Sequence, residues 1–150
     1  MEKLRVFAVA SGGGHWEELR LLRQSFEGAE VTYATTLAGL ASRDNIPNLV
    51  VVPDCNRNRP LESLRCLTSL FIAILRVRPH VVISTGALPG YLALSVAKVL
   101  RKKTIWVDSV ANAAEISMAG QKARRWADLW LTQWPQIAER NSVEYSGSVL

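Results

Sequence analysis

Three polar side chains of this sequence could move a proton in a reaction. His15 directly follows three glycines, whereas Asp108 and Glu115 flank a loop after an apolar segment. A histidine titrates near neutral pH and can accept a proton from an attacking hydroxyl group. A helix that starts at His15 would favour the neutral, basic imidazole. We therefore predict catalytic roles for His15 and Asp108. Two alternatives remain: His15 only caps or packs a helix, or Asp108 and Glu115 orient a sugar or serve as the base instead.

Two glycine-rich turns could bind a negatively charged ligand. Each follows an apolar segment and precedes a helical pattern, in the stretches SGGGH (11–15) and STGALPG (84–90). Glycine lets the backbone approach a ligand, and the first N–H groups of a helix point at negative charge. A tight turn without a ligand is the alternative. The residues predicted to bind substrate in these turns are Ser11, Gly12, Gly13, Gly14, Thr85, Gly86 and Gly90.

The first glycine turn does not fit the two best-known nucleotide motifs. It continues neither as the G-x-x-x-x-G-K-S/T of a P-loop nor as a complete G-x-G-x-x-G. A dinucleotide site also needs an acid after the second strand to hold the ribose, but the stretch VTYATT (31–36) ends in threonines. We therefore do not expect NAD. The sequence also predicts no other cofactor and no metal.

Other loops that follow predicted strands could add binding groups, because open α/β sheets bind ligands beyond the carboxyl ends of their strands. Arg57 and Arg59 lie in the stretch DCNRNRP, where arginine can hold phosphate oxygens with two hydrogen bonds. A solvated loop is the alternative for these two arginines. The remaining residues predicted to bind substrate are Ser109, Asn112, Glu115 and Trp134.

The elements that must position these groups alternate along the chain. The predicted strands are 5–10, 31–34, 49–52, 81–84, 104–107 and 129–132, with a further strand-like segment at 143–145. The predicted helices are 16–26, 61–77, 90–100 and 118–126. This alternation is typical of an α/β fold: a Rossmann-like parallel sheet with helices on both faces. Without repeats or linkers, residues 1–150 are predicted to form a single domain.

The predicted helix 61–77 is apolar around most of its circumference. Its uncharged part, between Arg65 and Arg76, is too short to cross a bilayer. We expect this helix to be buried against the sheet, because helices beside parallel sheets normally have this character. Contact with a membrane or a partner protein is the alternative.

The amino-acid composition limits the kinds of molecule that the protein could bind. Eighteen Lys and Arg against thirteen Asp and Glu give a net charge of +5, which suits nucleotides, lipid phosphates or an acidic membrane surface. Nucleic acid is not expected, because the arginines are scattered and no nucleic-acid-binding motif is present. The two cysteines predict neither a zinc site nor a disulfide framework, which favours the cytoplasm. The start MEKLRVFAVA runs directly into the glycine turn, so we expect neither a signal peptide nor a membrane span.

Four stretches occur in an order that resembles a known family: SGGGHWEEL, STGALPGYLALSVAKVL, IWVDSVAN and ADLWLTQWP. Together they resemble the acceptor-side, N-terminal half of GT-B glycosyltransferases. The chain is most similar to the membrane-associated subunit family of the two-part UDP-N-acetylglucosamine transferase of dolichol-linked oligosaccharide synthesis and its bacterial exopolysaccharide counterparts. The resemblance covers nearly the whole chain. The peptidoglycan lipid-linked N-acetylglucosaminyltransferase is similar more distantly.

The resemblance implies a domain that binds a polyprenyl-diphosphate-linked acceptor at the membrane surface. The UDP-sugar would bind mainly to a second Rossmann-like half, which the resemblance assigns to a separate donor-binding subunit. The turn from Gly12 to His15 would then face the shared cleft, with His15 as the base. The eukaryotic members carry an N-terminal membrane anchor, which we do not expect here. This chain has Asp108-Ser109 where they typically have another acid followed by serine.

The sequence thus predicts a subunit of a heteromeric, inverting glycosyltransferase. A sugar of N-acetylglucosamine or glucuronic acid type would pass from a UDP-sugar to a polyprenyl-diphosphate-linked saccharide. The expected location is cytoplasmic and peripheral, at the inner face of the membrane. Two alternatives remain: a non-catalytic subunit that recruits the catalytic partner to the membrane, and an unrelated nucleotide-binding regulator.

Overall fold

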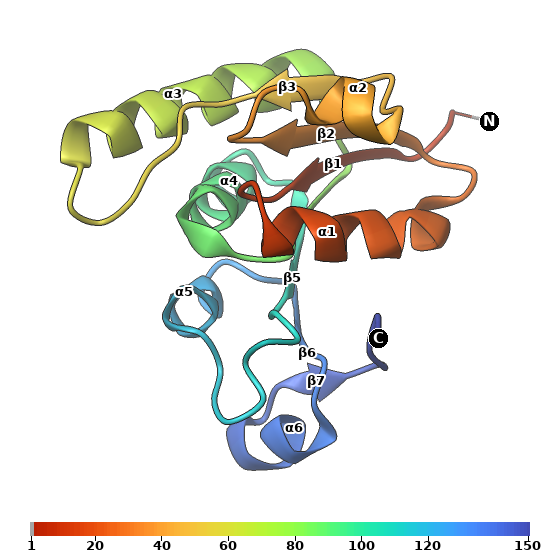
Figure 1. Ribbon diagram of the computed structural model, residues 1–150, viewed down its shortest axis with the longest axis vertical. Coiled ribbons are helices and arrows are strands. Elements are labelled where there is room, and N and C mark those ends of the chain that lie inside the picture. Colours follow the sequence, from red (N-terminus) through yellow and green to blue (C-terminus); the bar gives the residue numbers. More distant parts are fainter. Residues whose placement is uncertain (1) are drawn as a thin grey trace.

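The computed structural model describes residues 2–150, which form one seven-stranded parallel sheet flanked by helices (Figure 1). The strands lie in the order β3-β2-β1-β4-β5-β6-β7. They are β1 (Arg5–Val9), β2 (Glu30–Thr35), β3 (Leu49–Val51), β4 (Val81–Ser84), β5 (Lys103–Val107), β6 (Leu129–Thr132) and β7 (Glu144–Tyr145). The helices are α1 (Gly14–Leu21), the 3₁₀ segment η1 (Leu22–Phe26), α2 (Leu40–Asp44), α3 (Pro60–Val77), α4 (Ala87–Val99), α5 (Met118–Ala123) and α6 (Pro135–Asn141).

The predicted Rossmann-like α/β fold is confirmed. Each predicted strand has its counterpart in the sheet, and the predicted helix 61–77 is α3, which begins with Pro60. The predicted helix 16–26 divides into α1 and η1, whereas α4 begins earlier and α5 ends earlier than predicted. The short helices α2 and α6 were not predicted, because five to seven residues contain too few helical repeats to give a periodic pattern.

Two apolar layers cover the central strands. β1 alternates between them: Phe7 and Val9 pack with residues of α3 and α4, and Val6 and Ala8 pack with Trp16 of α1. The helix α3 packs on α4, and α4 packs on α5, so these three helices form one layer (Figure 1). The helices α1 and α2 contribute to the other layer.

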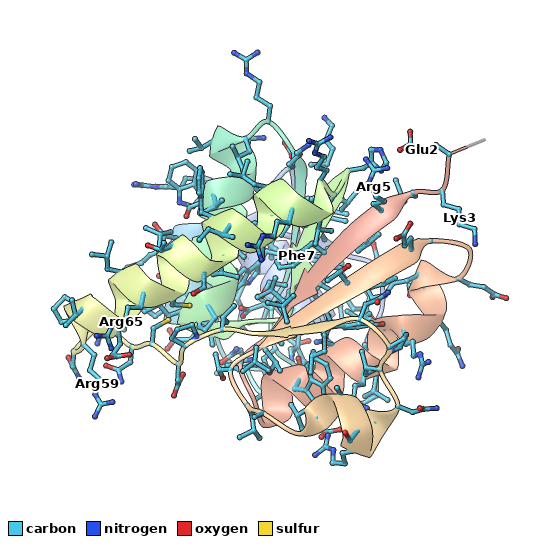
Figure 2. The ribbon with its side chains drawn as sticks, turned by 90° about the horizontal axis from the view of Figure 1, so that it is seen from above. Glu2, Lys3, Arg5, Phe7, Arg59 and Arg65 are labelled. Carbon is cyan, nitrogen blue, oxygen red and sulfur yellow. The ribbon has the colours of Figure 1, made fainter. Side chains whose placement is uncertain are left out.

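The prediction that α3 is buried is wrong for one of its faces. Its inner face is buried through residues such as Cys66, Leu70 and Ile74. The outer face leaves large apolar side chains exposed, at Leu61 (62%), Leu64 (58%), Phe71 (41%), Ile72 (43%) and Leu75 (48%). Figure 2 looks down on this helix and labels Arg59 and Arg65 at its start. Because the sheet and α4 cover only one side of α3, the apolar character of its other side is left facing outward.

Within residues 2–150, no helix is long and apolar enough to cross a bilayer.

Candidate functional site

The two glycine turns meet at the centre of the sheet. β1 and β4 are neighbours, with Val9 beside Ser84, although the chain first visits β2 and β3 on the far side of β1. The strand order therefore reverses between β1 and β4. Ligands of open α/β sheets bind at this reversal, beyond the carboxyl ends of the strands. The first turn joins β1 to α1 and the second joins β4 to α4, so both flank this position.

The turns leave two helix N-termini free to face a ligand. Gly13 precedes α1 and Gly86 precedes α4, and neither helix has a side chain that caps its first N–H groups. Uncapped N–H groups at a helix start can donate to a phosphate or hydroxyl group, and the helix dipole adds to the attraction for an anion. The backbone N–H of Gly12 is already used, because it donates to Thr36 Oγ1 at 3.1 Å.

Close packing requires glycine in the second turn. Gly86 has φ 146° and ψ −178°, a conformation that is almost restricted to glycine, and a Cβ there would lie 2.4 Å from His15 Nδ1. A Cβ at Gly90 would lie 1.9 Å from Ser84 Oγ. The second turn is thus packed directly against the imidazole that the first turn carries.

His15 is held by two contacts with Thr85. The imidazole Nδ1 lies 3.1 Å from the Thr85 carbonyl oxygen, and the Thr85 hydroxyl donates to the His15 carbonyl oxygen at 2.6 Å. A carbonyl oxygen can only accept, so the hydrogen bond places the proton on Nδ1 and leaves the Nε2 lone pair available in the neutral ring. This tautomer is the one that a general base needs at Nε2.

The structure adds Glu18, which was not predicted as a site residue. This buried glutamate accepts hydrogen bonds from Ser109 Oγ at 2.8 Å and from the Val110 backbone N–H at 3.0 Å, and Gln133 Nε2 lies 3.4 Å away. Glu18 follows His15 by three residues, so both project from the same face of α1. The helix is therefore fixed to two rim loops, through His15 to the β4–α4 loop and through Glu18 to the β5–α5 loop. Only the helical spacing of the stretch HWEE could have indicated this from sequence.

Asp108 is buried, with 2% of its surface exposed, and its hydrogen-bonding capacity is used within the chain. Its carboxylate accepts from Trp106 Nε1 at 3.1 Å, from the Ser117 backbone N–H at 2.9 Å and from Ser117 Oγ at 2.5 Å. Ser117 in turn caps α5 by accepting from the Gly120 N–H. These contacts favour a role for Asp108 in positioning the loop between β5 and α5. Its predicted catalytic role stays a prediction.

Other predicted site residues lie in that loop or contact it. The Asn112 N–H donates to the Ser109 carbonyl oxygen at 3.0 Å, and Trp134 Nε1 donates to the Val110 carbonyl oxygen at 2.7 Å. Glu115 is exposed. The loop is therefore braced from α1 by Glu18 and from the start of α6 by Trp134, which is the residue before that helix.

The two predicted arginines lie in the loop between β3 and α3. Arg57 is exposed, and its Nη1 contacts the Met118 sulfur at 2.8 Å, which places this arginine beside the start of α5. Arg59 is exposed and directly precedes α3. Their contacts connect them with α3 and α5 rather than with the His15 imidazole, so their predicted role in substrate binding stays a prediction.

A second feature of the molecule is an open apolar groove of about 830 Å³ on the sheet face that carries α1. Apolar side chains of β4, β5 and β6 form its floor, including Ile83, Ile105 and Leu131. η1 and the segment 146–149 form its walls, and Leu21, at the end of α1, lines it with 53% of its surface exposed.

The fold defines the class of this domain: it is a Rossmann-like α/β domain, similar in fold to domains of solved UDP-sugar enzymes. The structure is similar to Acinetobacter baumannii MurG, with a TM-score of 0.75 and 16% identity over 89% of this chain and 43% of that one. It is also similar to a putative UDP-N-acetylglucosamine 2-epimerase from Listeria monocytogenes, with a TM-score of 0.74 and 14% identity over 93% of this chain and 42% of that one. At such identities the likeness concerns the fold alone.

Comparison of the sequence gives more specific relatives than comparison of the fold. The chain is similar to two proteins named UDP-N-acetylglucosamine transferase subunit ALG14. It is 30% identical to the Eremothecium gossypii protein over 90 aligned positions, covering 52% of this chain and 40% of that protein. It is 26% identical to the Yarrowia lipolytica protein over 170 aligned positions, covering 93% of this chain and 77% of that protein. No protein-family model matches the chain. The resemblance predicted from the four sequence stretches is thereby confirmed.

Proposed function

We propose that this chain is the acceptor-side subunit of a heteromeric, inverting UDP-sugar glycosyltransferase. The observation that supports this most directly is the His15 imidazole between two glycine turns at the reversal of strand order, with its Nδ1 on the Thr85 carbonyl oxygen. The similarity to proteins named as subunits of a UDP-N-acetylglucosamine transferase supports the substrate class.

In the proposed reaction, His15 Nε2 accepts the proton of the acceptor hydroxyl group while that oxygen attacks the sugar of the UDP-sugar. The bond between the sugar and UDP breaks at the same carbon, and UDP leaves with the bonding electrons. The uncapped N–H groups at the starts of α1 and α4 stabilise phosphate charge in the cleft. Glu18 and Asp108 hold the surrounding loops in place.

The proposed partner is a donor-binding polypeptide. A parallel sheet normally has both faces covered, yet the face formed by β4, β5 and β6 carries the open apolar groove. The chain also spans less than half of the similar solved structures. We assign the groove to a segment of the donor-binding subunit, whose remaining surface would close the cleft over His15.

The proposed acceptor is a polyprenyl-diphosphate-linked saccharide, used at the inner face of the membrane. The exposed apolar face of α3 supports this location, with Arg59 and Arg65 at its start (Figure 2) and Arg57 in the loop before it. Each basic residue near an anionic surface contributes about 1 kcal/mol. Co-sedimentation with anionic liposomes should be weakened by high salt, and no co-sedimentation, either alone or with the partner, would contradict this part of the proposal.

The test of the function is co-expression with the product of the neighbouring open reading frame, followed by a screen of UDP-sugars with a lipid-linked acceptor. Replacing His15 by Ala should lower turnover of the complex by about 10²-fold or more while the protein stays folded, because a general base is lost. Turnover within a few fold of the wild type would favour the non-catalytic recruiting subunit instead.

The chain by itself should neither transfer sugar nor bind UDP-sugars tightly, since the donor site is assigned to the partner. Isothermal titration of the purified chain tests this. Tight nucleotide binding by the chain alone would favour the nucleotide-binding regulator, and robust sugar transfer by the chain alone would contradict the two-subunit enzyme.

A further inference from the structure

A pocket of about 790 Å³ between α4 and α5 has a strongly basic lining and takes no part in the site around His15. The lining residues are Tyr91, Gln121, Lys122, Arg124 and Arg125. Three of these five carry a positive charge, all three are exposed, and none of the five is acidic. Among residues 2–150, the ion pairs involve other cations, so these three charges are not neutralised by a carboxylate of the chain.

Two tryptophans hold polar groups of this pocket in place. The Arg124 guanidinium lies over the ring of Trp130, 5.2 Å from its centroid, and Trp130 Nε1 is fixed by the Gly120 carbonyl oxygen at 2.8 Å. Trp126 Nε1 donates to the Tyr91 hydroxyl oxygen at 3.1 Å. Because that oxygen accepts from the indole, the Tyr91 O–H remains free to donate to a ligand.

The arrangement matches the chemistry of a phosphate group. Guanidinium groups hold phosphate oxygens with paired hydrogen bonds, an ammonium group adds charge, and a phenol adds one neutral donor. A purely solvated set of charges would need no fixed tyrosine and no stacked guanidinium. Both tryptophans belong to the stretch WADLWLTQWP, and the site around His15 gives neither of them a role.

We propose that the pocket between α4 and α5 binds the headgroup phosphate of an anionic membrane lipid. We assign the phosphate to a membrane lipid because of the neighbouring helices. α4 packs between α5 and α3, and the outer face of α3 exposes Phe71, Ile72 and Leu75. One layer of helices thus combines an apolar surface with a positively charged pocket, which is the combination that binds anionic lipid surfaces. The lipid as source rests on the membrane contact proposed above, whereas the phosphate site does not depend on glycosyl transfer.

The test measures partition of the full chain onto phosphatidylcholine vesicles with and without phosphatidylglycerol. The variant carries Lys122→Gln, Arg124→Gln and Arg125→Gln. A matched control carries Lys3→Gln, Arg23→Gln and Arg140→Gln, which remove the same charge from exposed positions outside the pocket. Each basic residue near the anionic surface strengthens partition about fivefold. The partition of the pocket variant onto the anionic vesicles should therefore fall by about 100-fold, and that of the control by a few fold at most.

A Tyr91→Phe variant distinguishes a defined phosphate-binding site from general electrostatic attraction, because it keeps every charge and removes one hydrogen-bond donor. It should weaken partition onto anionic vesicles by a few fold. Equal losses in the pocket variant and the control, or no effect of Tyr91→Phe, would overturn the site. Strong, pocket-dependent binding of soluble glycerol phosphate without vesicle binding would overturn the lipid as its source.

The outcomes are independent of the proposed enzyme activity. The pocket variants should leave sugar transfer by the complex to a short-chain, water-soluble acceptor unchanged, whereas His15→Ala should leave vesicle partition unchanged. Thermal unfolding of each variant shows that a loss of partition does not come from a loss of folding.

Discussion

Replacing Gly86 by Ala tests the contact between the two glycine turns. The φ of 146° at Gly86 is strained for alanine, at about 1–3 kcal/mol. The added Cβ would lie 2.4 Å from His15 Nδ1 and 2.5 Å from Cε1, and overpacking of this kind costs about 1–3 kcal/mol. The free energy of unfolding should therefore fall by about 2–6 kcal/mol, and the thermal midpoint of this chain by about 4–24 °C.

The same substitution should also impair the proposed reaction. To restore an ordinary contact, the imidazole must move by about 1 Å, and displacement of a reacting group by that distance lowers turnover by about 10²-fold. Thermal unfolding of the chain and sugar transfer by the complex measure the two effects.

Gly14→Ala is the matched control, because a Cβ at Gly14 meets nothing within 4 Å and the residue lies at the start of α1. Alanine there should leave the free energy of unfolding unchanged or raise it by up to about 1 kcal/mol. If Gly86→Ala is as stable as Gly14→Ala in thermal unfolding, the inferred packing of the second turn on His15 is refuted.

Three further predictions concern other parts of the molecule. Glu18→Gln should lower the free energy of unfolding, measured in urea, by about 1.5–3 kcal/mol, because the carboxylate accepts charge-assisted hydrogen bonds in a buried position. Leu21→Glu should abolish co-purification with the donor-binding subunit while the chain stays folded, because Leu21 lines the apolar groove and is 53% exposed. The hydrogen bond from Arg43 lowers the pKa of Asp44 to about 2. This carboxylate therefore stabilises the fold above about pH 4, and the stabilisation is lost as the pH falls toward 2. Urea denaturation of Asp44→Asn across this pH range should show a smaller pH dependence than that of the wild type.

Controls for these predictions come from exposed positions. Glu17→Gln removes an exposed glutamate paired with Arg20 and Arg43, and should change the free energy of unfolding by about 1 kcal/mol or less. Val99→Glu lies on α4, outside the groove, with 70% of Val99 exposed, and should leave co-purification intact. A Glu18→Gln variant as stable as Glu17→Gln, a Leu21→Glu variant that still co-purifies, or unchanged acid sensitivity in Asp44→Asn would each contradict its prediction.

The sequence alone determined the sheet and the position of the glycine turns. Strand formation here depends on short β-branched segments such as 81–84, and helix boundaries depend on local signals such as Pro60 at the start of α3. Parallel strands place their carboxyl ends at one edge, so it could also be predicted that His15 and the second turn lie on a common rim. These features depend on neighbours along the chain, which the sequence contains.

The tertiary structure alone decided which groups touch. Ser109 and Glu18 are 91 positions apart, and Thr85 and His15 are 70 apart, so neither pair leaves a local pattern. Exposure was equally undetermined: the composition of α3 could not show that its outer face would be left uncovered, nor could the apolar strands β4, β5 and β6 reveal an open groove. Burial, hydrogen-bond partners and open surface depend on which elements lie against one another, and that is fixed only when the whole sheet and its helices have packed together.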